Sequence, residues 1–375
     1  MFPLFYIILL TFALLYVILI CAAIIYWNRH NDLSAVLSDH TSPPLYLSVL
    51  IPFRNEVAHL PALLKSLELQ SMDSDFWECI FIDDHSTDQG AELIRRISKK
   101  NFRIVLNPGK GKKSAIAAAV NISGGNYIVQ TDADCTMGKD WLKSIYTRLV
   151  QSDIQVLAGP VHISNSTSFL GYFQTFDFIA FMGMTHLGIQ SRLWHLANGA
   201  NLIYNKSVYT LMNTTNRQAA TASGDDMFLI ETAAGTNKEK IGFLKEPKAL
   251  VQTQAVSDLR TFIHQRLRWG SKMGKLRDWK IKLVLGITLM FSILLVVVSI
   301  AAMFVNGWWA IAGLLWTLKG SIDFIYLKNL APFFNQKIPF FPYLRCTIIY
   351  PVYLCLMSIL SIFKRNYEWK GRDSR

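Results

Sequence analysis

Two pairs of aspartates stand directly after short apolar runs in the first half of the chain. Asp132 and Asp134 form an Asp-x-Asp, and Asp83 and Asp84 open a second acidic cluster. Carboxylates spaced by one residue at a strand exit can project toward one point and supply the oxygen ligands that Mg²⁺ or Mn²⁺ prefers. Each cluster by itself is equally consistent with a polar turn that caps a helix. Their occurrence after two different runs favours a ligand site.

A basic loop, Lys110-Gly111-Lys112-Lys113, lies between the two acidic clusters. It precedes a segment with helical spacing, so its ammonium groups and the free N–H groups of that helix could hold phosphate. The GxxxxGK[ST] spacing of a P-loop is absent. A solvated basic turn is the alternative, and the loop alone favours it.

Two further motifs lie in the second half of the chain. Asp225 and Asp226 begin an apolar helical run, where a carboxylate could act as a general base toward an attacking hydroxyl or simply cap the helix. Gln265, Arg268 and Trp269 lie on a basic amphipathic stretch beside an apolar run. The alternative for this stretch is a juxtamembrane helix that contacts lipid phosphates.

Alternating strands and helices must position these motifs. Apolar runs predict strands over residues 47–52, 79–82, 102–106 and 127–130. Segments of helical spacing lie between them, over residues 56–69, 91–98 and 113–122. This order predicts an α/β fold with a parallel, doubly wound sheet and right-handed crossovers. Ligands bind beyond the carboxyl ends of such strands, where the acidic clusters stand. Pro52 is expected to end the first strand.

The composition excludes a disordered chain and a wholly water-soluble one. Over 375 residues, 51% are hydrophobic and 17% are charged, and the mean hydropathy is +0.26. The net charge of +12 suits anionic lipid, a phosphate-bearing substrate or nucleic acid. No RNP-like, helix-turn-helix or zinc-finger spacing is present, and the positive charges gather beside apolar runs. We therefore expect no nucleic-acid partner.

Three charge-free runs are candidates for crossing a bilayer: residues 2–27, 283–318 and 346–363. The first lacks the basic start and the cleavage site of a signal peptide, so we expect a retained anchor. Asn306 and Gly307 divide the second run into a hairpin, with a return helix over about 307–327.

Lys319 and Asp323 lie four residues apart on one face of the predicted return helix. They could form a functional intramembrane pair, but snorkelling toward the interface is the favoured interpretation near a helix end. If the last run also spans, the basic tail lies outside, against the positive-inside rule. Either residues 331–342 or the last run is therefore expected to be re-entrant or interfacial, or one of these assignments is wrong.

Basic residues flank the globular stretch where it meets the apolar runs: Arg29, Lys272, Lys275, Arg277, Lys280 and Lys282. By the positive-inside rule, the globular part faces the cytoplasm at the inner or plasma membrane. The cysteines are odd in number and lack CxxC spacing: Cys21, Cys79, Cys135, Cys346 and Cys355. We expect neither a disulfide nor a zinc site.

The motifs IPFRNE, IDDHSTD, TDADC, SGDD and QRLRW, taken in this order, resemble the motif series of inverting, membrane-bound family 2 glycosyltransferases with a GT-A fold. This group includes cellulose and hyaluronan synthases and many lipid glycosyltransferases. The resemblance runs from Ser48 to Trp269. It implies a GT-A (Rossmann-like, nucleotide-diphospho-sugar transferase) domain with one N-terminal and two to three C-terminal transmembrane helices. It also implies a metal-dependent, hexosyltransferase-like activity that uses a UDP- or GDP-sugar.

The resemblance assigns roles on the donor side to residues that match the family motifs. Those placed on the donor are Pro52, Arg54, Glu56, Asp83, Asp84, Lys112 and Asp132. Asp134 is the implied ligand of Mg²⁺ or Mn²⁺.

On the acceptor side, Asp226 matches the catalytic base. The residues implied to lie beneath the acceptor or to close over donor and acceptor are Gly199, Ala200, Asn201, Asp225, Gln265, Arg268 and Trp269.

Two positions depart from the family pattern. Asp225 replaces the usual glutamate and is one methylene shorter. His85 replaces a common glycine, which leads us to expect that the turn there does not need a positive φ. The closing Glu368-Trp369-Lys370-Gly371-Arg372 resembles a tail of lipid-directed members and favours a cytoplasmic end.

The acceptor is expected to be a membrane-associated lipid that receives a single sugar, because three or four membrane helices are few for a polymer channel. Residues 169–187 could form a groove for a lipid chain, but a buried core helix is the favoured interpretation. The alternatives are a processive polysaccharide synthase and a catalytically inactive membrane protein that binds nucleotide sugars.

These inferences divide the chain into five parts. They are an N-terminal anchor over 1–28, a catalytic domain over 45–256, an interfacial segment over 257–282, a transmembrane region over 283–363 and a basic tail over 364–375.

Overall fold

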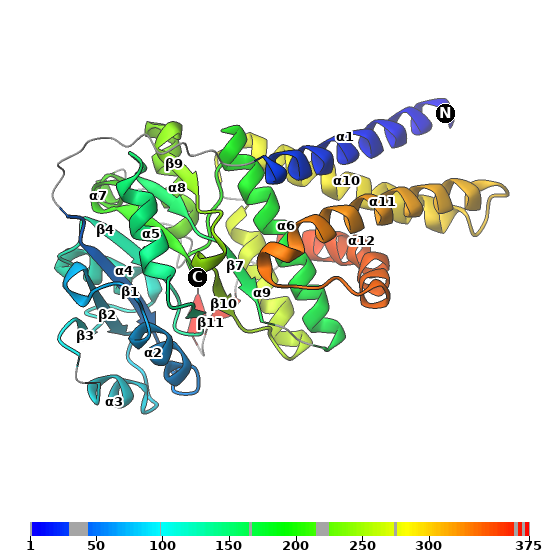
Figure 1. Cartoon of the computed structure of the whole chain (residues 1–375). Coiled ribbons are helices and arrows are strands. Elements are labelled where there is room, and N and C mark those ends of the chain that lie inside the picture. Colours follow the sequence, from blue (N-terminus) through cyan, green and yellow to red (C-terminus); the bar gives the residue numbers. More distant parts are fainter. Residues whose placement is uncertain are drawn as a thin grey trace. The chain divides into compact units, whose positions relative to one another are not determined.

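The structure, a computed structural model, describes residues 2–29, 44–97, 99–164, 167–214, 225–273, 276–363, 367–369 and 372–374. The chain divides into two compact units, whose elements are labelled in Figure 1. A helical unit comprises Met1–His30, Asn165–Trp194 and Ala255–Tyr367. A sheet unit comprises Asn31–Ser164, His195–Gln254 and Glu368–Arg375. Residues 165–194, which lie in the middle of the globular stretch of the sequence, thus belong to the helical unit.

The core of the sheet unit is a seven-stranded sheet in the order β3-β2-β1-β4-β8-β6-β9. Its strands are β1 (Leu47–Phe53), β2 (Trp77–Asp83), β3 (Phe102–Leu106), β4 (Tyr127–Gln130), β6 (Val156–Ala158), β8 (Leu202–Asn205) and β9 (Ile241–Phe243). The first four strands along the chain pair with one another in parallel. β8 is antiparallel to both β4 and β6. The predicted α/β class is confirmed, and so is the parallel pairing of the four predicted strands; the sequence did not predict the antiparallel β8.

The reversal of β8 follows from where the chain enters this strand. The Ala200 carbonyl accepts a hydrogen bond of 2.8 Å from the Thr131 hydroxyl, which stands directly after β4. Residues 199–201 therefore lie at the carboxyl edge of the sheet, and β8 has to run back from that edge. The strand and helix alternation that predicted parallel pairing ends with β4.

A smaller three-stranded sheet has the order β5-β10-β7. Its strands are β5 (Thr136–Met137), β7 (Val161–Ile163) and β10 (Val251–Thr253). The helices of the sheet unit are α2 (Leu60–Glu68), α3 (Gly90–Arg95), α4 (Lys112–Ile122), α5 (Trp141–Val150), α7 (Lys206–Thr214) and α8 (Asp225–Thr236), with single turns η1 (Ser74–Phe76), η2 (Lys238–Lys240) and η3 (Pro247–Ala249).

Pro52 lies within β1 and does not end it, contrary to the expectation from the sequence. Leu50 directs its carbonyl to Thr131 on the β4 side, and Phe53 directs its carbonyl to Asp84 on the β2 side. The backbone groups of successive residues in a strand point to alternate sides, so the backbone nitrogen of Pro52 faces the β4 side. Pro52 lies beyond Leu50, the last residue of β1 that pairs with β4. Its missing N–H removes no ladder hydrogen bond there.

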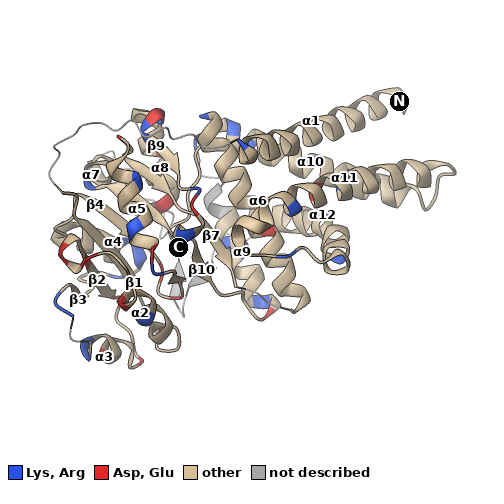
Figure 2. Ribbon diagram, viewed as in Figure 1, with Lys and Arg blue, Asp and Glu red and all other residues tan. Residues whose placement is uncertain are grey.

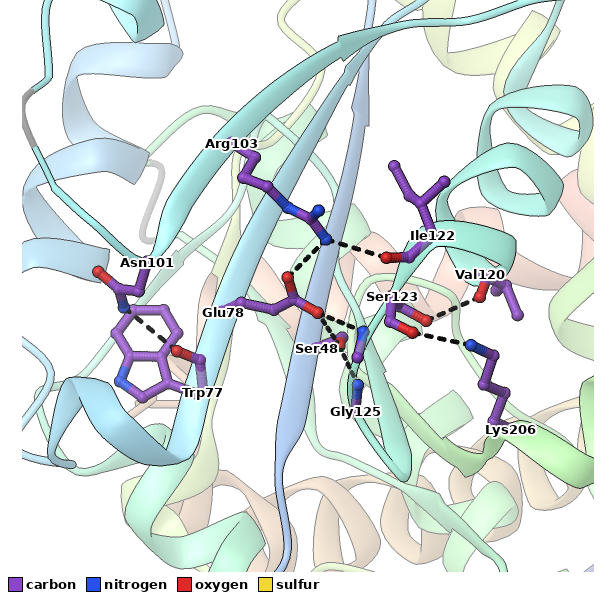
Figure 3. Close-up of polar contacts among 11 residues, drawn as sticks. Ser48, Trp77, Glu78, Asn101, Arg103, Val120, Ile122, Ser123, Gly125 and Lys206 are labelled. Carbon is purple, nitrogen blue, oxygen red and sulfur yellow. Dashed lines mark hydrogen bonds and ion pairs between the residues drawn. The ribbon is translucent and has the colours of Figure 1, made fainter.

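A polar cluster secures the starting end of the sheet, opposite to the edge where ligands bind in such folds (Figure 3). Ser48 and Glu78 are register partners on β1 and β2, and the Ser48 hydroxyl donates to the Glu78 carboxylate at 2.6 Å. Arg103 pairs with the same carboxylate at 2.6 Å. The Gly125 N–H donates to the Ser48 hydroxyl at 2.8 Å. This cluster holds the turn that leads into β4, and its polar groups are internally paired.

The helical unit contains α1 (Phe2–Asn28), α6 (Phe169–Ser191), α9 (Leu259–Met273), α10 (Trp279–Ala301), α11 (Trp308–Leu330), η4 (Ala331–Phe334) and α12 (Phe340–Phe363). Four helical segments in the described part of the chain are long and apolar enough to cross a membrane, namely Pro3–Asn28, Trp279–Ala301, Trp308–Phe334 and Phe340–Ser361. One is N-terminal and three are C-terminal, as predicted. Figure 2 shows α1 without Lys, Arg, Asp or Glu. The predicted hairpin is present, since Gly307 adopts a φ of 86° and α11 begins at the next residue.

Lys319 does not snorkel, so the favoured interpretation of this residue is wrong. Its side chain is 1% exposed and forms an ion pair with Asp323. Tyr16 of α1 donates its hydroxyl to Asp323 at 2.7 Å, and Lys319 lies 3.3 Å from the same hydroxyl. The polar groups are satisfied between two helices, so the lysine has no need to reach the interface.

α12 begins beside the middle of α11. The ring of Phe340 at the start of α12 contacts Phe324, with centroids 6.1 Å apart, and Tyr343 donates to the Gly320 carbonyl at 2.5 Å. The segment between the two helices therefore runs back along α11. α6 is largely buried within the helical unit, which agrees with the interpretation of residues 169–187 as a core helix.

Candidate active site

The candidate site lies at the carboxyl edge of the large sheet. The parallel strands β1, β2 and β4 end at Phe53, Asp83 and Gln130. Parallel strands end at the same edge, so the loops that follow them converge. The first two loops are interlocked, because the Asn55 side-chain oxygen accepts the Thr87 N–H at 2.8 Å.

His85 adopts a φ of 58°, so the expectation that this turn would avoid positive φ is wrong. A ring nitrogen of His85 lies 2.8 Å from the Gly109 carbonyl. This contact ties the loop after β2 to the basic loop and helps to hold a conformation that glycine would adopt more easily.

The predicted residues of the first loop lie against the second. Arg54 donates to the Asp84 carbonyl at 3.1 Å. Glu56 is buried, and its carboxylate lies 2.6 Å from a ring nitrogen of His59. Asp83 accepts the Ser86 N–H at 2.8 Å.

Asp84 anchors the basic loop. Its side chain is 1% exposed, and one carboxylate oxygen accepts the Gly111 N–H at 2.8 Å and the Asn107 side-chain amide at 2.7 Å. Asn107 in turn accepts from the Gly109 N–H at 3.1 Å and the Ser114 hydroxyl at 2.8 Å. Since Gly111 is the N-cap of α4, these bonds set the start of that helix. Sequence reasoning missed Asn107, although an asparagine directly after a strand and before Pro-Gly is a turn signal.

Lys112 and the Asp-x-Asp motif meet at this edge. The Lys112 ammonium forms an ion pair with Asp132. Burial raises the pKa of the Asp134 carboxyl above its usual value, nearby Asp132 raises it further, and Lys112 opposes the rise. A divalent cation beside the two carboxylates would favour their ionised forms.

The donor set is consistent with Mg²⁺ or Mn²⁺. No group of three or more His, Cys, Asp or Glu side chains able to hold a metal occurs among the described residues. Mg²⁺ is commonly held by one or two carboxylates and completes its shell with water and substrate phosphates. Asp132 and Asp134 meet that requirement.

Asp226 is joined to the end of β4 through Gly199 and Ala200. Its carboxylate accepts the Gly199 N–H at 3.1 Å, and the Ala200 carbonyl accepts from Thr131 at 2.8 Å. A Cβ on Gly199 would stand 2.8 Å from the Gln130 amide nitrogen and 3.4 Å from the Asp226 carboxylate. Two predicted motifs that are distant in sequence are thus connected by one short segment, in which a Cβ at position 199 would crowd the Gln130 and Asp226 side chains.

The remaining predicted residues differ in what they contact. Asn201 is fully buried, and its amide bonds to the Pro160 and Ala249 carbonyls at 2.9 and 3.0 Å, so within the described contacts it supports the fold. Asp225 begins α8, but Ser223, Gly224 and the Asp225 side chain lie outside what the structure describes. Gln265, Arg268 and Trp269 lie on α9 of the helical unit, and their closing role stays a prediction.

The family model described as Glycosyl transferase family 2 matches residues 48–222. Residues 48–222 are therefore similar to family 2 glycosyltransferases. The predicted GT-A fold is confirmed by a mannosyltransferase from Pyrobaculum calidifontis, solved in complex with GDP-Man and Mn²⁺. It has a TM-score of 0.53 and 14% identity, with coverage of 97% of this chain and 98% of that one.

Curated relatives match shorter parts of the chain. The 4,4'-diaponeurosporenoate glycosyltransferase of Staphylococcus haemolyticus is 36% identical over 98 residues, which cover 25% of each protein. The dolichyl-phosphate beta-glucosyltransferase of Dictyostelium discoideum is 30% identical over 145 residues, which cover 35% of this chain and 44% of that protein. The match therefore spans less than half the length of these relatives.

Proposed function

We propose that the protein transfers one sugar from a nucleotide diphosphate donor to a lipid acceptor at the membrane, with inversion at the anomeric carbon. The names of the relatives support a lipid acceptor, since one names dolichyl phosphate and the other a carotenoid acid. The observation that carries the proposal is the link from Asp226 through Gly199 and Ala200 to the end of β4. It links a candidate base to the end of the strand that the Asp-x-Asp follows.

On the donor side, Arg54, Asp83 and the loop anchored by Asp84 would bind the UDP or GDP moiety. Lys112 and the N-terminus of α4 would hold its diphosphate. Asp132 and Asp134 would hold Mg²⁺ or Mn²⁺, which when bound neutralises charge on the departing diphosphate.

On the acceptor side, Asp226 would accept the proton of the attacking hydroxyl. The acceptor oxygen forms a bond to the anomeric carbon as the bond from that carbon to the diphosphate breaks, and the nucleoside diphosphate leaves with the electron pair. An acceptor phosphate is already largely ionised at pH 7, so a base would contribute little to its attack. A hydroxyl acceptor would therefore use Asp226 as a base, whereas a lipid phosphate, as the name of one relative prints, would not need one.

The test uses the full-length protein in lipid nanodiscs, with Mn²⁺, a panel of UDP- and GDP-sugars and added membrane lipid extract. We expect release of nucleoside diphosphate that depends on both one donor and the added lipid. Asp226→Asn should lower turnover about 10²- to 10⁴-fold while donor affinity by calorimetry stays unchanged. Asp134→Ala should instead weaken Mn²⁺-dependent donor binding.

Asp153→Asn is the matched control, because the Asp153 side chain is 82% exposed on the surface of the sheet unit. It should retain full activity. Near-normal turnover of Asp226→Asn would remove Asp226 as the base. Donor binding without lipid-dependent release would favour an inactive nucleotide-sugar-binding protein, and products with many added sugars by mass spectrometry would favour a processive synthase.

A further inference from the structure

A buried ion pair involves Arg266 of α9. This residue lies inside the QxxRW motif, at one of the two positions where the motif specifies no residue type. Arg266 stands between Gln265 and Arg268, and its side chain is 8% exposed. Its guanidinium donates to the Asp177 carboxylate of α6 at 2.8 Å. The other oxygen of that carboxylate accepts the Tyr350 hydroxyl of α12 at 3.0 Å. One carboxylate thus joins three helices of the helical unit.

The same guanidinium is packed between two aromatic rings of its own helix. Its central carbon lies 4.5 Å from the centroid of the Trp269 ring and 5.0 Å from that of Phe262. Residues at these spacings share one face of an α-helix. Trp269 has a further aromatic neighbour, since the Phe178 ring of α6 lies 6.0 Å from it. Arg266 and Phe178 therefore both contact the indole.

Asp177 provides charge compensation for this guanidinium. The Nε and Nη2 atoms of Arg266 are buried and have no hydrogen-bond partner among the described residues. A buried cation that loses its carboxylate is left uncompensated, which costs far more than the loss of an exposed pair. The orientation of the guanidinium therefore depends on Asp177, and the indole packs on that guanidinium.

We propose that Asp177 and Arg266 are positioning residues that hold the indole of Trp269 in the orientation required for acceptor binding. Asp177 orients the guanidinium, and the guanidinium fixes the ring through its cation–π contact. The link to acceptor binding rests on the proposed function and on the closing role that the family resemblance implies for Trp269, whereas the control of the indole orientation rests on neither. Neither residue is proposed to touch substrate.

The experiment separates positioning from stability. The full-length protein is labelled with 5-fluorotryptophan, and the ¹⁹F signal of Trp269 is assigned by its loss in Trp269→Phe. The double variant Asp177→Asn, Arg266→Gln removes both charges, keeps an acceptor for Tyr350 and removes the cation from the ring. We expect its melting temperature to approach that of the unsubstituted protein, whereas Asp177→Asn alone is strongly destabilised.

The double variant should still show a displaced or broadened Trp269 signal. Its KM for the acceptor lipid should rise about ten-fold, with the donor KM changed less than two-fold. Arg266→Lys retains the pairing charge without the planar group, so it should fold and also displace the signal. Arg260→Gln, an exposed change on the same helix, should alter none of these quantities.

Recovery of both the Trp269 signal and the acceptor KM in the double variant would show that the pair serves stability alone. An unchanged signal in Arg266→Lys, should the double variant not fold, would also overturn the proposal. If the unsubstituted protein transfers no sugar to any lipid, the proposed function fails. The ¹⁹F signal would then still decide whether the pair orients Trp269.

Discussion

Several aspartates lie near the carboxyl edge of the sheet, and their carboxylates have different surroundings. The Asp84 carboxylate is occupied by the Gly111 N–H and the Asn107 amide, so it organises a loop. Asp134 is partly buried beside a second carboxylate, which raises its pKa and favours a cation as partner. Asp226 accepts the backbone N–H groups of Gly199 and Met227 and stands at the start of a helix. Hydrogen-bond partners, more than residue type, distinguish these roles.

Gly199 provides the sharpest test of the site at the scale of one residue. In Gly199→Ala, the new Cβ would collide with the buried Gln130 amide at 2.8 Å and crowd the Asp226 carboxylate. We expect kcat to fall about ten-fold or more, because small displacements of a catalytic group reduce rate strongly. Steady-state kinetics, donor affinity and the melting temperature measure the effect.

Gly235→Ala is the control for this substitution. Gly235 lies in α8, and a Cβ there meets nothing within 4 Å. This change should leave kcat unaltered and raise helix stability by up to about 1 kcal/mol. Equal kcat values for both alanine variants would contradict the assignment of the Gly199 segment to the active site.

At the scale of elements, a polar contact within the bundle joins α1 to α11. The Lys319 and Asp323 pair and the Tyr16 hydroxyl satisfy one another inside an otherwise apolar bundle. Such a contact specifies which faces of two apolar helices meet, because lipid tails are as apolar as the helix surfaces and apolar contact alone favours no particular pair of faces.

Lys319→Met should destabilise the protein by about 3–5 kcal/mol, because it leaves Asp323 buried without its cation. The double variant Lys319→Met, Asp323→Leu should recover most of that loss. Thermal unfolding in nanodiscs measures both, with exposed Lys328→Met as the control. If the single and double variants are equally unstable, the buried charge is not the cause.

At the scale of the whole molecule, we propose that the sheet unit faces the cytoplasm. In a background without the natural cysteines, Lys139→Cys on the sheet unit should resist a membrane-impermeant maleimide in intact cells. Phe304→Cys, in the 82% exposed position between α10 and α11, should react. Permeabilised cells should label both. The opposite pattern in intact cells would reverse the proposed orientation.

The sequence by itself determined the features that depend on short stretches of chain. Apolar runs followed by polar turns located β1, β2, β3 and β4, and charge-free runs located α1, α10 and most of α11. The site motifs were visible for the same reason, since each occupies a few consecutive residues at the end of an element. Hydrophobic periodicity and turn chemistry are local properties, so they can be recognised without knowing the fold.

Tertiary structure alone decided which distant groups pair. Asp177 and Tyr350 are 173 residues apart, and Tyr16 and Asp323 are 307 apart, so no local pattern relates them. The direction of β8, the burial of Lys319 and the anchoring role of Asp84 likewise depend on partners brought together by folding. A buried polar group must find a partner wherever the chain places one, and that choice is made by the packing of the whole unit rather than by neighbours in sequence.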